Sequence, residues 1–251
     1  MDTWNAEQYL KFEKQRTLPS YDLAASLGDI KPQTALDIGC GPGNSTAVLR
    51  EFFTDAHITG IDNSPVMIEK ARKAHPEMNF ELRGARDLEG KYELIFSNAC
   101  LHWVPDHHSL IPFIMDHLAD GGTLAVQVPM NGAEPLYKSA QELIDSGRWD
   151  FSSVTETNEI LTPEEYYEVL SACSRDFDIW EKVYYHIMPS HQALVDWVKS
   201  TKLRPYLAVL NKAEEECFLA ELLACAQKQY QRQKDGNIIF RFRRLFFTAK
   251  K

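Results

Sequence analysis

The chain has 251 residues, which is enough for one domain with a large core or for a core domain with a small cap. Its formal net charge of −9 is not typical of a general nucleic-acid binder and does not favour adhesion to anionic membranes. The sequence has neither a basic start followed by an apolar stretch nor an apolar run of about 18 residues, the length of a membrane-spanning helix. We therefore expect a cytoplasmic protein, a monomer or weak homodimer, whose partner is a small molecule and neither nucleic acid nor membrane.

The first half of the chain predicts alternating strands and helices. Residues 1–30 are predicted to form two short helices, the first of which contains Trp4, Tyr9, Phe12 and Arg16. Five strands then follow, at Thr34–Ile38, His57–Asp62, Met78–Leu82, Tyr92–Asn98 and Thr123–Val128. The helices between them are predicted to begin near Ser45, Pro65 and Ser109. Asp120-Gly121-Gly122 predicts a turn before the fifth strand. This alternation favours a parallel sheet with right-handed crossovers.

Beyond Pro129 the pattern changes to longer helical stretches with two further strands. The predicted helices are Glu134–Asp145, Pro163–Ala172, His191–Ser200 and Lys212–Gln233. The predicted strands are Phe177–Met188 and Ile238–Ala249, the second of which follows a turn at Asp235-Gly236-Asn237.

A glycine loop lies between the first strand and the first helix of the alternating region. It reads Gly39-x-Gly41-x-Gly43, and Asp62 ends the next strand 19 positions after the last glycine. An acid about 20 residues beyond such a loop is placed to accept hydrogen bonds from a ribose. The loop therefore predicts a site for a nucleoside-containing cofactor; the alternative is a glycine turn that only joins strand to helix.

Two residues disfavour a pyrophosphate in this loop. Pro42 has no N–H to donate, and Asp37 places a negative charge two residues before the first glycine. A cofactor with a cationic end and no phosphate suits the loop better, and S-adenosyl-L-methionine has these properties. A dinucleotide-dependent oxidoreductase is accordingly disfavoured.

The loop and the segment Gly60–Ile68 resemble motifs I and II of the class I S-adenosylmethionine-dependent methyltransferases. Further segments are similar to the trans-aconitate methyltransferases within that class: residues 2–5, 95–107, 184–192 and 196–205. The resemblance implies a Rossmann-like α/β fold with helical cap insertions. Its mostly parallel seven-stranded sheet would have the order 3-2-1-4-5-7-6, with the last strand antiparallel. It also implies a single methyltransferase domain, with a cofactor-binding core at 30–130, helical cap and substrate segments with the sixth strand at 131–235, and a final strand at 236–251.

The resemblance implies which residues bind the cofactor, whose product is S-adenosyl-L-homocysteine. The expected residues are Asp37, Gly39, Cys40, Gly41, Gly43, Asp62, Asn63, Asn98, Ala99 and His102. Many relatives also carry an acid after the third strand that accepts from the adenine amino group. Here that position is Gly84, so either backbone carbonyls or the offset Asp87 take its place.

A carboxylate acceptor is ionised at neutral pH and needs no general base, so catalysis would rest on alignment and exclusion of water. The acceptor expected from the resemblance is trans-aconitate, and the candidate binding residues are Tyr184, Tyr185, His186, Arg204 and Arg244. Arg244 shares a strand face with phenylalanines, so its partner is either a buried acid or the substrate.

Two alternatives remain open from the residues alone. One is a methyltransferase for a different acceptor, such as a monocarboxylate, an amine or a phenol. A neutral acceptor with a hydroxyl would need a base, for which His102 and His186 are the candidates. A non-enzymatic module would bind S-adenosylmethionine without transferring its methyl group. No metal site is predicted, and the five cysteines are expected to be reduced.

Overall fold

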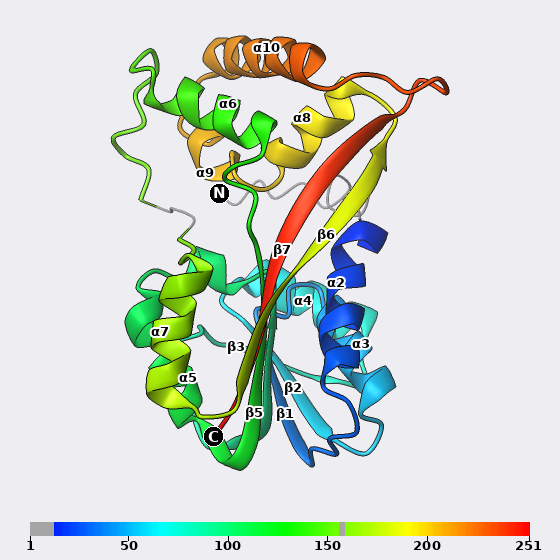
Figure 1. Cartoon of the computed structure of the whole chain (residues 1–251), viewed down its shortest axis with the longest axis vertical. Helices are drawn as coiled ribbons and strands as arrows, with labels where there is room; N and C mark the ends of the chain where they lie inside the picture. The colour runs from blue at the N-terminus through cyan, green and yellow to red at the C-terminus, as the bar shows by residue number, and fades with distance from the viewer. Residues whose placement is uncertain (1–12, 156–158) are drawn as a thin grey trace. The chain divides into compact units, whose positions relative to one another are not determined.

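The computed structural model describes residues 13–155 and 159–251 (Figure 1). Seven strands form one sheet of order β3-β2-β1-β4-β5-β7-β6, which confirms the order expected from the sequence. The strands are β1 (Thr34–Ile38), β2 (His57–Asp62), β3 (Asn79–Leu82), β4 (Tyr92–Asn98), β5 (Leu118–Pro129), β6 (Phe177–Met188) and β7 (Ile238–Lys250). Strands β1 to β5 pair in parallel.

Helices connect these strands at nearly the predicted places. They are α2 (Glu13–Ser26), α3 (Asn44–Phe52), α4 (Pro65–Ala74), the 3₁₀ turn η1 (Leu101–Trp103), α5 (His107–Asp116), α6 (Pro135–Asp145), α7 (Pro163–Cys173), α8 (His191–Lys199), α9 (Arg204–Leu207) and α10 (Lys212–Gln229). Arg16 belongs to α2, which continues through Pro19. The predictions for Trp4, Tyr9 and Phe12 lie outside the described residues.

The predicted turn at Asp120-Gly121-Gly122 lies inside β5. Tyr92 of β4 pairs with Leu118, but Leu94 pairs with Thr123, so the ladder shifts register across these residues. A Cβ on Gly122 would come within 2.9 Å of two backbone carbonyl oxygens. Glycine therefore permits a bulge, and the strand begins before the residues that suggested a turn.

Strand β7 runs against β5. The Lys251 amide donates to the Gly122 carbonyl (3.0 Å), and the Met130 amide donates to the Arg243 carbonyl (2.9 Å). Residue numbers therefore fall along β7 as they rise along β5. This confirms the antiparallel last strand.

The described residues form two compact units. The larger contains residues 14–129, 159–182 and 245–251, with β1–β5 and parts of β6 and β7. In Figure 1, α5 and α7 lie on one side of its sheet and α2 and α3 on the other. Strand residues such as Leu36, Ile61 and Phe96 are fully buried between these helices.

The smaller unit contains residues 130–155 and 183–244. Helix α10 packs against α6 and α8, and the unit also holds the remaining parts of β6 and β7. Its fully buried aromatic side chains include Trp197, Phe218 and Phe240.

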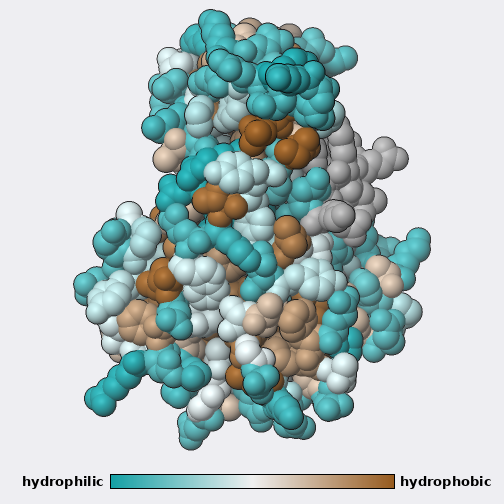
Figure 2. Space-filling model, turned by 45° about the vertical axis from the view of Figure 1, so that its right-hand side comes forward, coloured by the Kyte–Doolittle hydropathy of each residue, from teal (hydrophilic) through white to brown (hydrophobic). Residues whose placement is uncertain are grey.

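Hydrophobic residues lie in separate patches on the mainly hydrophilic face drawn in Figure 2. Exposed apolar side chains of the smaller unit include Val183, Ile187 and Ile239. Across the part of the chain that the structure describes, no helix has the length and apolar character needed to cross a membrane.

Candidate active site

The glycine loop after β1 requires its glycines for two reasons. Gly39, Gly41 and Gly43 have φ angles of +74°, +55° and +99°, in the left-handed region that favours glycine. A Cβ on Gly39 would also lie 2.1 Å from the Cys100 Sγ. The loop thus packs directly against the segment that follows β4, and a side chain at position 39 has no room.

The amide groups of this loop already have acceptors within the protein. Gly39 and Cys40 donate to the Ile61 carbonyl at 2.8 and 3.0 Å, and Gly43 donates to the Cys40 carbonyl at 3.0 Å. Gly41 donates to the Asp62 carboxylate at 3.0 Å. Because a pyrophosphate binds on unused loop amides, this arrangement supports the prediction of a cofactor without phosphate.

Asp37 is a buried carboxylate beneath the loop. Its Oδ2 accepts hydrogen bonds from the Ser45 and Thr46 hydroxyls, both at 2.6 Å. Its Oδ1 is buried and has no hydrogen-bond partner among the described residues. Burial, with a smaller contribution from the nearby Asp62 charge, raises the pKa of Asp37 to about 6. An incompletely paired buried carboxylate is suited to a cationic ligand group.

Asp62 lies at the carboxyl end of β2. Its carboxylate accepts from the amides of Gly41 (3.0 Å) and Ser64 (2.9 Å), and burial raises its pKa. Each carboxylate oxygen can accept a second hydrogen bond, so two ribose hydroxyls can still donate to it. Asn63 follows directly and precedes α4.

The end of β4 lies on the other side of the loop. The Asn98 Oδ1 is buried and has no hydrogen-bond partner among the described residues. Ala99 has a φ of +54°, and its amide donates to the Gln127 carbonyl at 2.9 Å. A non-glycine residue in this region is strained, and such strain concentrates at ligand sites. His102, in η1, is buried.

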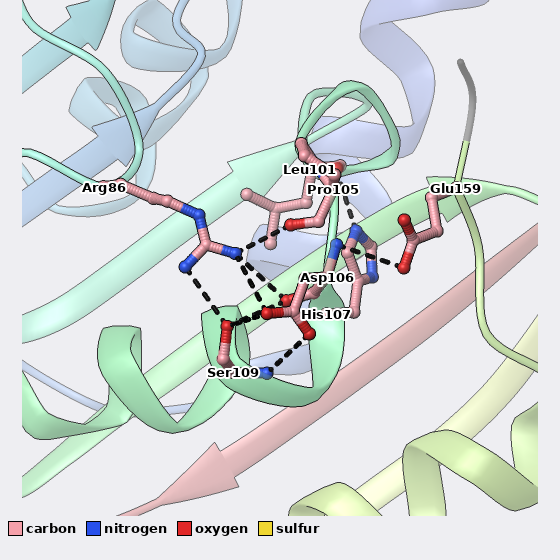
Figure 3. Close-up of polar contacts among 7 residues, drawn as sticks. All are labelled: Arg86, Leu101, Pro105, Asp106, His107, Ser109 and Glu159. Carbon is pink, nitrogen blue, oxygen red and sulfur yellow. Dashed lines mark hydrogen bonds and ion pairs between the residues drawn. The ribbon is translucent and has the colours of Figure 1, made fainter.

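A polar network holds the segment after η1 (Figure 3). Asp106 adopts a left-handed conformation and caps α5 by accepting from the Ser109 amide at 3.3 Å. The Arg86 guanidinium donates to the Pro105 carbonyl (2.7 Å) and the Asp106 carbonyl (3.1 Å). Arg86 thus connects the β3–β4 loop to the start of α5. These hydrogen bonds were not predicted from the sequence.

Three further hydrogen bonds hold the same segment. The His107 ring bonds the Leu101 carbonyl (2.9 Å) and the Tyr166 hydroxyl (2.6 Å). Glu159 accepts from the Asp106 amide at 3.1 Å. The segment that carries His102 is therefore anchored by residues from α7 and from the chain before it.

The candidate acceptor residues lie in the smaller unit, where β6 alternates between a buried and an exposed face. Tyr184 and His186 are 8% and 5% exposed, whereas Tyr185 between them is 63% exposed. Arg244 is 3% exposed, and Arg204 is an exposed residue at the start of α9. The structure therefore separates Tyr185 from the buried face of Tyr184 and His186.

Arg244 and His186 lie among aromatic rings. The Arg244 guanidinium carbon lies 4.8 Å from the Phe242 ring centre and 5.9 Å from that of Tyr184. The His186 ring lies 4.9 Å from Trp197, and its Nε2 has no hydrogen-bond partner among the described residues. Burial and the Arg244 charge lower the pKa of His186 to about 4. The pair presents one fixed cation and one neutral imidazole.

Two groups of residues do not offer further chemistry. Across the described parts of the chain, no three His, Cys, Asp or Glu side chains gather as metal ligands. Burial raises the pKa values of the Cys40 and Cys100 thiols, the latter to about 12. Neither thiol is therefore activated as a nucleophile.

Comparison with known proteins decides the family. A family model described as a methyltransferase domain matches residues 10–172. The trans-aconitate 2-methyltransferase of Shigella flexneri is 40% identical over 259 residues, covering 100% of this chain and 99% of that protein. This chain is an S-adenosylmethionine-dependent methyltransferase.

Solved structures agree with the fold of this methyltransferase. The YcgJ protein from Bacillus subtilis superposes with a TM-score of 0.63 at 14% identity, covering 93% of this chain and 98% of that chain. The O-methyltransferase of a trans-AT PKS multienzyme from Brevibacillus brevis, in complex with S-adenosyl-L-homocysteine, gives a TM-score of 0.54 at 15% identity, covering 97% of this chain and 75% of that chain. The fold is the Rossmann-like class I fold.

The cofactor is S-adenosyl-L-methionine, which supplies a methyl group on a sulfonium centre. The larger unit offers chemistry that fits it. Asp37 and Asn98 each hold a buried oxygen with no hydrogen-bond partner among the described residues, and the loop amides offer nothing to a phosphate. Buried acceptor oxygens suit the cationic methionine end of this cofactor.

Proposed function

We propose that this methyltransferase esterifies one carboxylate of a small polycarboxylic acid, with trans-aconitate as the preferred acceptor. The observation that carries the proposal is the 40% identity, over the whole chain, to a trans-aconitate 2-methyltransferase. The buried cation of the smaller unit supplies independent chemical support, because a polyanionic acceptor requires positive charge in an acidic protein.

In this proposal Arg244 binds a carboxylate of the acceptor. Its guanidinium is buried beside the Phe242 and Tyr184 rings. Rings on a guanidinium face restrict its rotation, and a guanidinium binds a planar carboxylate in bidentate geometry. Tyr184 and His186 provide further hydrogen bonds from the same strand face, and Arg204 supplies a second charge. Tyr185 is the weakest member of the predicted set because its side chain is exposed.

The reaction in this proposal needs no general base. The acceptor carboxylate is ionised at neutral pH. A buried imidazole whose pKa is lowered to about 4 is a poor base at that pH, which favours an acceptor that has no proton to lose. The protein then contributes by aligning the acceptor oxygen, the methyl carbon and the sulfur, and by excluding water.

On the cofactor side, we propose that the predicted residues divide by ligand part. Asp37, Asn98 and Ala99 contact the methionine end, together with His102 and the glycine loop that includes Cys40. Asp62 accepts from the ribose hydroxyls, and Asn63 lies beside the adenine. The buried acceptor oxygens of Asp37 and Asn98 and the amide contacts of Asp62 support this division.

The test is turnover with radiolabelled cofactor and a panel of small acids, an amine and a phenol. The expected product is a base-labile methyl ester on trans-aconitate. Arg244→Met should raise the KM for trans-aconitate by about 100-fold or more, since a charge-assisted pair is worth about 1.5–3 kcal/mol and its loss leaves the substrate carboxylate unpaired. Arg243→Met on the opposite strand face is the matched control. Turnover of another acceptor with no ester on trans-aconitate rejects the substrate assignment.

A further inference from the structure

Asn131 lies in the short segment that connects β5 to α6. This segment runs beside β7 (Figure 1), and the Met130 amide donates to the Arg243 carbonyl at 2.9 Å. The return hydrogen bond runs from the Arg243 amide to the Asn131 Oδ1, at 2.7 Å. The Asn131 side chain therefore takes the place of a main-chain carbonyl at the end of an antiparallel ladder, beside the backbone that carries Arg244.

Further contacts fix the position of Asn131. Its carbonyl accepts from the Glu134 amide at 2.9 Å, which closes a turn before α6. Glu134 is itself buried and pairs with Arg241 of β7. Because both the backbone and the side-chain oxygen of Asn131 are held, the position of its amide nitrogen is held with them.

The amide nitrogen of Asn131 has no acceptor within the described protein. Asn131 is 3% exposed, and its Nδ2 is buried with no hydrogen-bond partner among the described residues. Exchanging the oxygen and nitrogen of this amide does not solve the problem, because the Arg243 amide requires an acceptor at the oxygen position. Buried donors are nearly always paired in folded proteins, so this NH₂ group indicates a ligand that accepts hydrogen bonds.

The candidate acceptor residues lie at the same end of β7. The Phe242 ring centre lies 4.8 Å from the Arg244 guanidinium carbon and 5.5 Å from the His186 ring. The Tyr137 ring of α6 lies 6.3 Å from the same Phe242 ring. Helix α6 thus packs on the strand face that carries Arg244, and the segment before α6 brings Asn131 to the neighbouring residue of β7.

We propose that Asn131 is a further acceptor-binding residue, whose Nδ2 donates to a carboxylate oxygen of the acid that Arg244 binds. The inference rests on the proposed function, which supplies a polycarboxylate. A carboxylate only accepts hydrogen bonds and has more lone pairs than one guanidinium uses. An uncharged amide adds a donor without a second buried charge, which would have to be desolvated. Asn131 also follows the end of β5 by two residues, and ligands of open α/β sheets bind at the carboxyl ends of the strands.

Two substitutions separate donation to a ligand from a structural role. Asn131→Asp keeps an oxygen for the Arg243 amide but replaces the donor by a carboxylate oxygen. Asn131→Ser also removes the donor, and its shorter side chain weakens the contact with the Arg243 amide without adding charge. If Asn131 donates to the acceptor, Asn131→Asp is the more damaging to acceptor binding. If Asn131 only holds β7, Asn131→Ser is the more damaging.

The first measurement is the KM for trans-aconitate at saturating S-adenosylmethionine. Asn131→Ser should raise it about tenfold, the factor that corresponds to a hydrogen bond with a charged group. Asn131→Asp should raise it about 100-fold or more, because the new acid also repels the acceptor. Titration of trans-aconitate into protein saturated with S-adenosylhomocysteine measures the same ratios without turnover. The affinity for S-adenosylhomocysteine itself should not change in either variant.

Asn211→Asp is the matched control. Asn211 caps α10 in the same unit, and its Oδ1 likewise accepts from backbone amides, those of Ala213 (3.0 Å) and Glu214 (3.1 Å). Its side chain is exposed, and Asp caps a helix as well as Asn does. This variant should therefore keep the wild-type KM for trans-aconitate.

The assignment of Asn131 is overturned if the wild type esterifies trans-aconitate and Asn131→Asp keeps its KM, or if Asn131→Ser has the larger effect. Where another acid of the panel is the better acceptor, the same variants are compared with that acid, so the substrate and the role of Asn131 are tested separately. If the wild type esterifies no acid, the proposed function fails and this inference fails with it.

A folding defect does not block the test. Should Asn131→Asp fail to fold, as judged by circular dichroism, Asn131→Ser decides. A tenfold rise in its KM with unchanged affinity for S-adenosylhomocysteine supports the proposal, and an unchanged KM overturns it.

Discussion

The buried carboxylate of Asp37 makes a sharp prediction about pH. Its pKa of about 6 means that part of the population is protonated in the ligand-free protein under mildly acidic conditions. If a cationic cofactor group binds the ionised form, binding must release a proton. The affinity for S-adenosylhomocysteine should therefore rise with pH until Asp37 is fully ionised, and then level off.

The magnitude follows from the fraction ionised. At pH 5 about one tenth of Asp37 carries its charge, so the affinity should be about tenfold weaker than at pH 8. On the acidic side of this range, the affinity for S-adenosylhomocysteine should change by nearly tenfold per pH unit. Asp62, whose pKa is also raised, adds to the dependence in the same direction.

Asp37→Asn isolates the contribution of Asp37. Asn keeps an acceptor oxygen for the Ser45 and Thr46 hydroxyls, so the hydrogen bonds made by Oδ2 can persist. The variant should bind more weakly at pH 8 and show a flatter profile between pH 5 and 8. Calorimetry at pH 6 in buffers of different ionisation enthalpy measures the released proton directly. Equal affinity at pH 5 and 8 in the wild type, with the same proton release in the variant, would refute this reasoning.

Stability should show the opposite trend in the ligand-free protein. The folded-state pKa lies above the ordinary value of 3.8, so ionisation of Asp37 opposes folding. The penalty is absent below pH 3.8 and grows to about 3 kcal/mol above pH 6. Urea denaturation should therefore show less loss of stability between pH 4 and 7 in Asp37→Asn than in the wild type.

Three further outcomes are expected. Gly39→Ala should lower the free energy of unfolding by more than about 3 kcal/mol, as measured by urea denaturation, because its Cβ would clash with Cys100. Gly28→Ala also has a positive φ but has open space around it, so it should lower the free energy of unfolding by only about 1–2 kcal/mol. Equal losses in the two variants would contradict the clash with Cys100 as the cause. At saturating cofactor, kcat/KM for the acceptor should not change between pH 6 and 9, since the lowered pKa of His186 keeps it neutral; a tenfold fall per pH unit below 6.5 would indicate a histidine base. Tyr184→Ala should raise the acceptor KM and Tyr185→Ala should not, in steady-state assays; the reverse result would place the acceptor on the exposed face of β6.

Local patterns were sufficient to predict most of the elements. The apolar runs that became β1, β2 and β4 match their predicted bounds, since buried parallel strands are short, continuous and bounded by turn residues. Pro65 marks the start of α4, and the glycine loop has the left-handed conformations that its spacing indicates. These features depend on residues close to one another in sequence.

Features that depend on distant residues were not predicted. Glycines at 121 and 122 indicated a turn, but pairing with β4 draws them into β5 as a bulge. The Arg86 contacts join residues about 20 positions apart, and no periodicity marks them. Likewise, residues 159–182 group with the larger unit, although the sequence places them among segments of the smaller one.

At the candidate acceptor site, the alternation of side chains along β6 does not by itself identify which residues are buried. Period two places Tyr184 and His186 on one face of β6 and Tyr185 on the other, but it does not say which face is covered. Trp197 of α8 decides this, because its ring packs against His186 and Phe242. Phe242 also lies against the buried Arg244 guanidinium, and a guanidinium that is held in this way loses less entropy when it binds a carboxylate. If the proposed function holds, Trp197→Leu should therefore weaken acceptor binding without altering the affinity for S-adenosylhomocysteine, since the residues assigned to the cofactor lie in the larger unit.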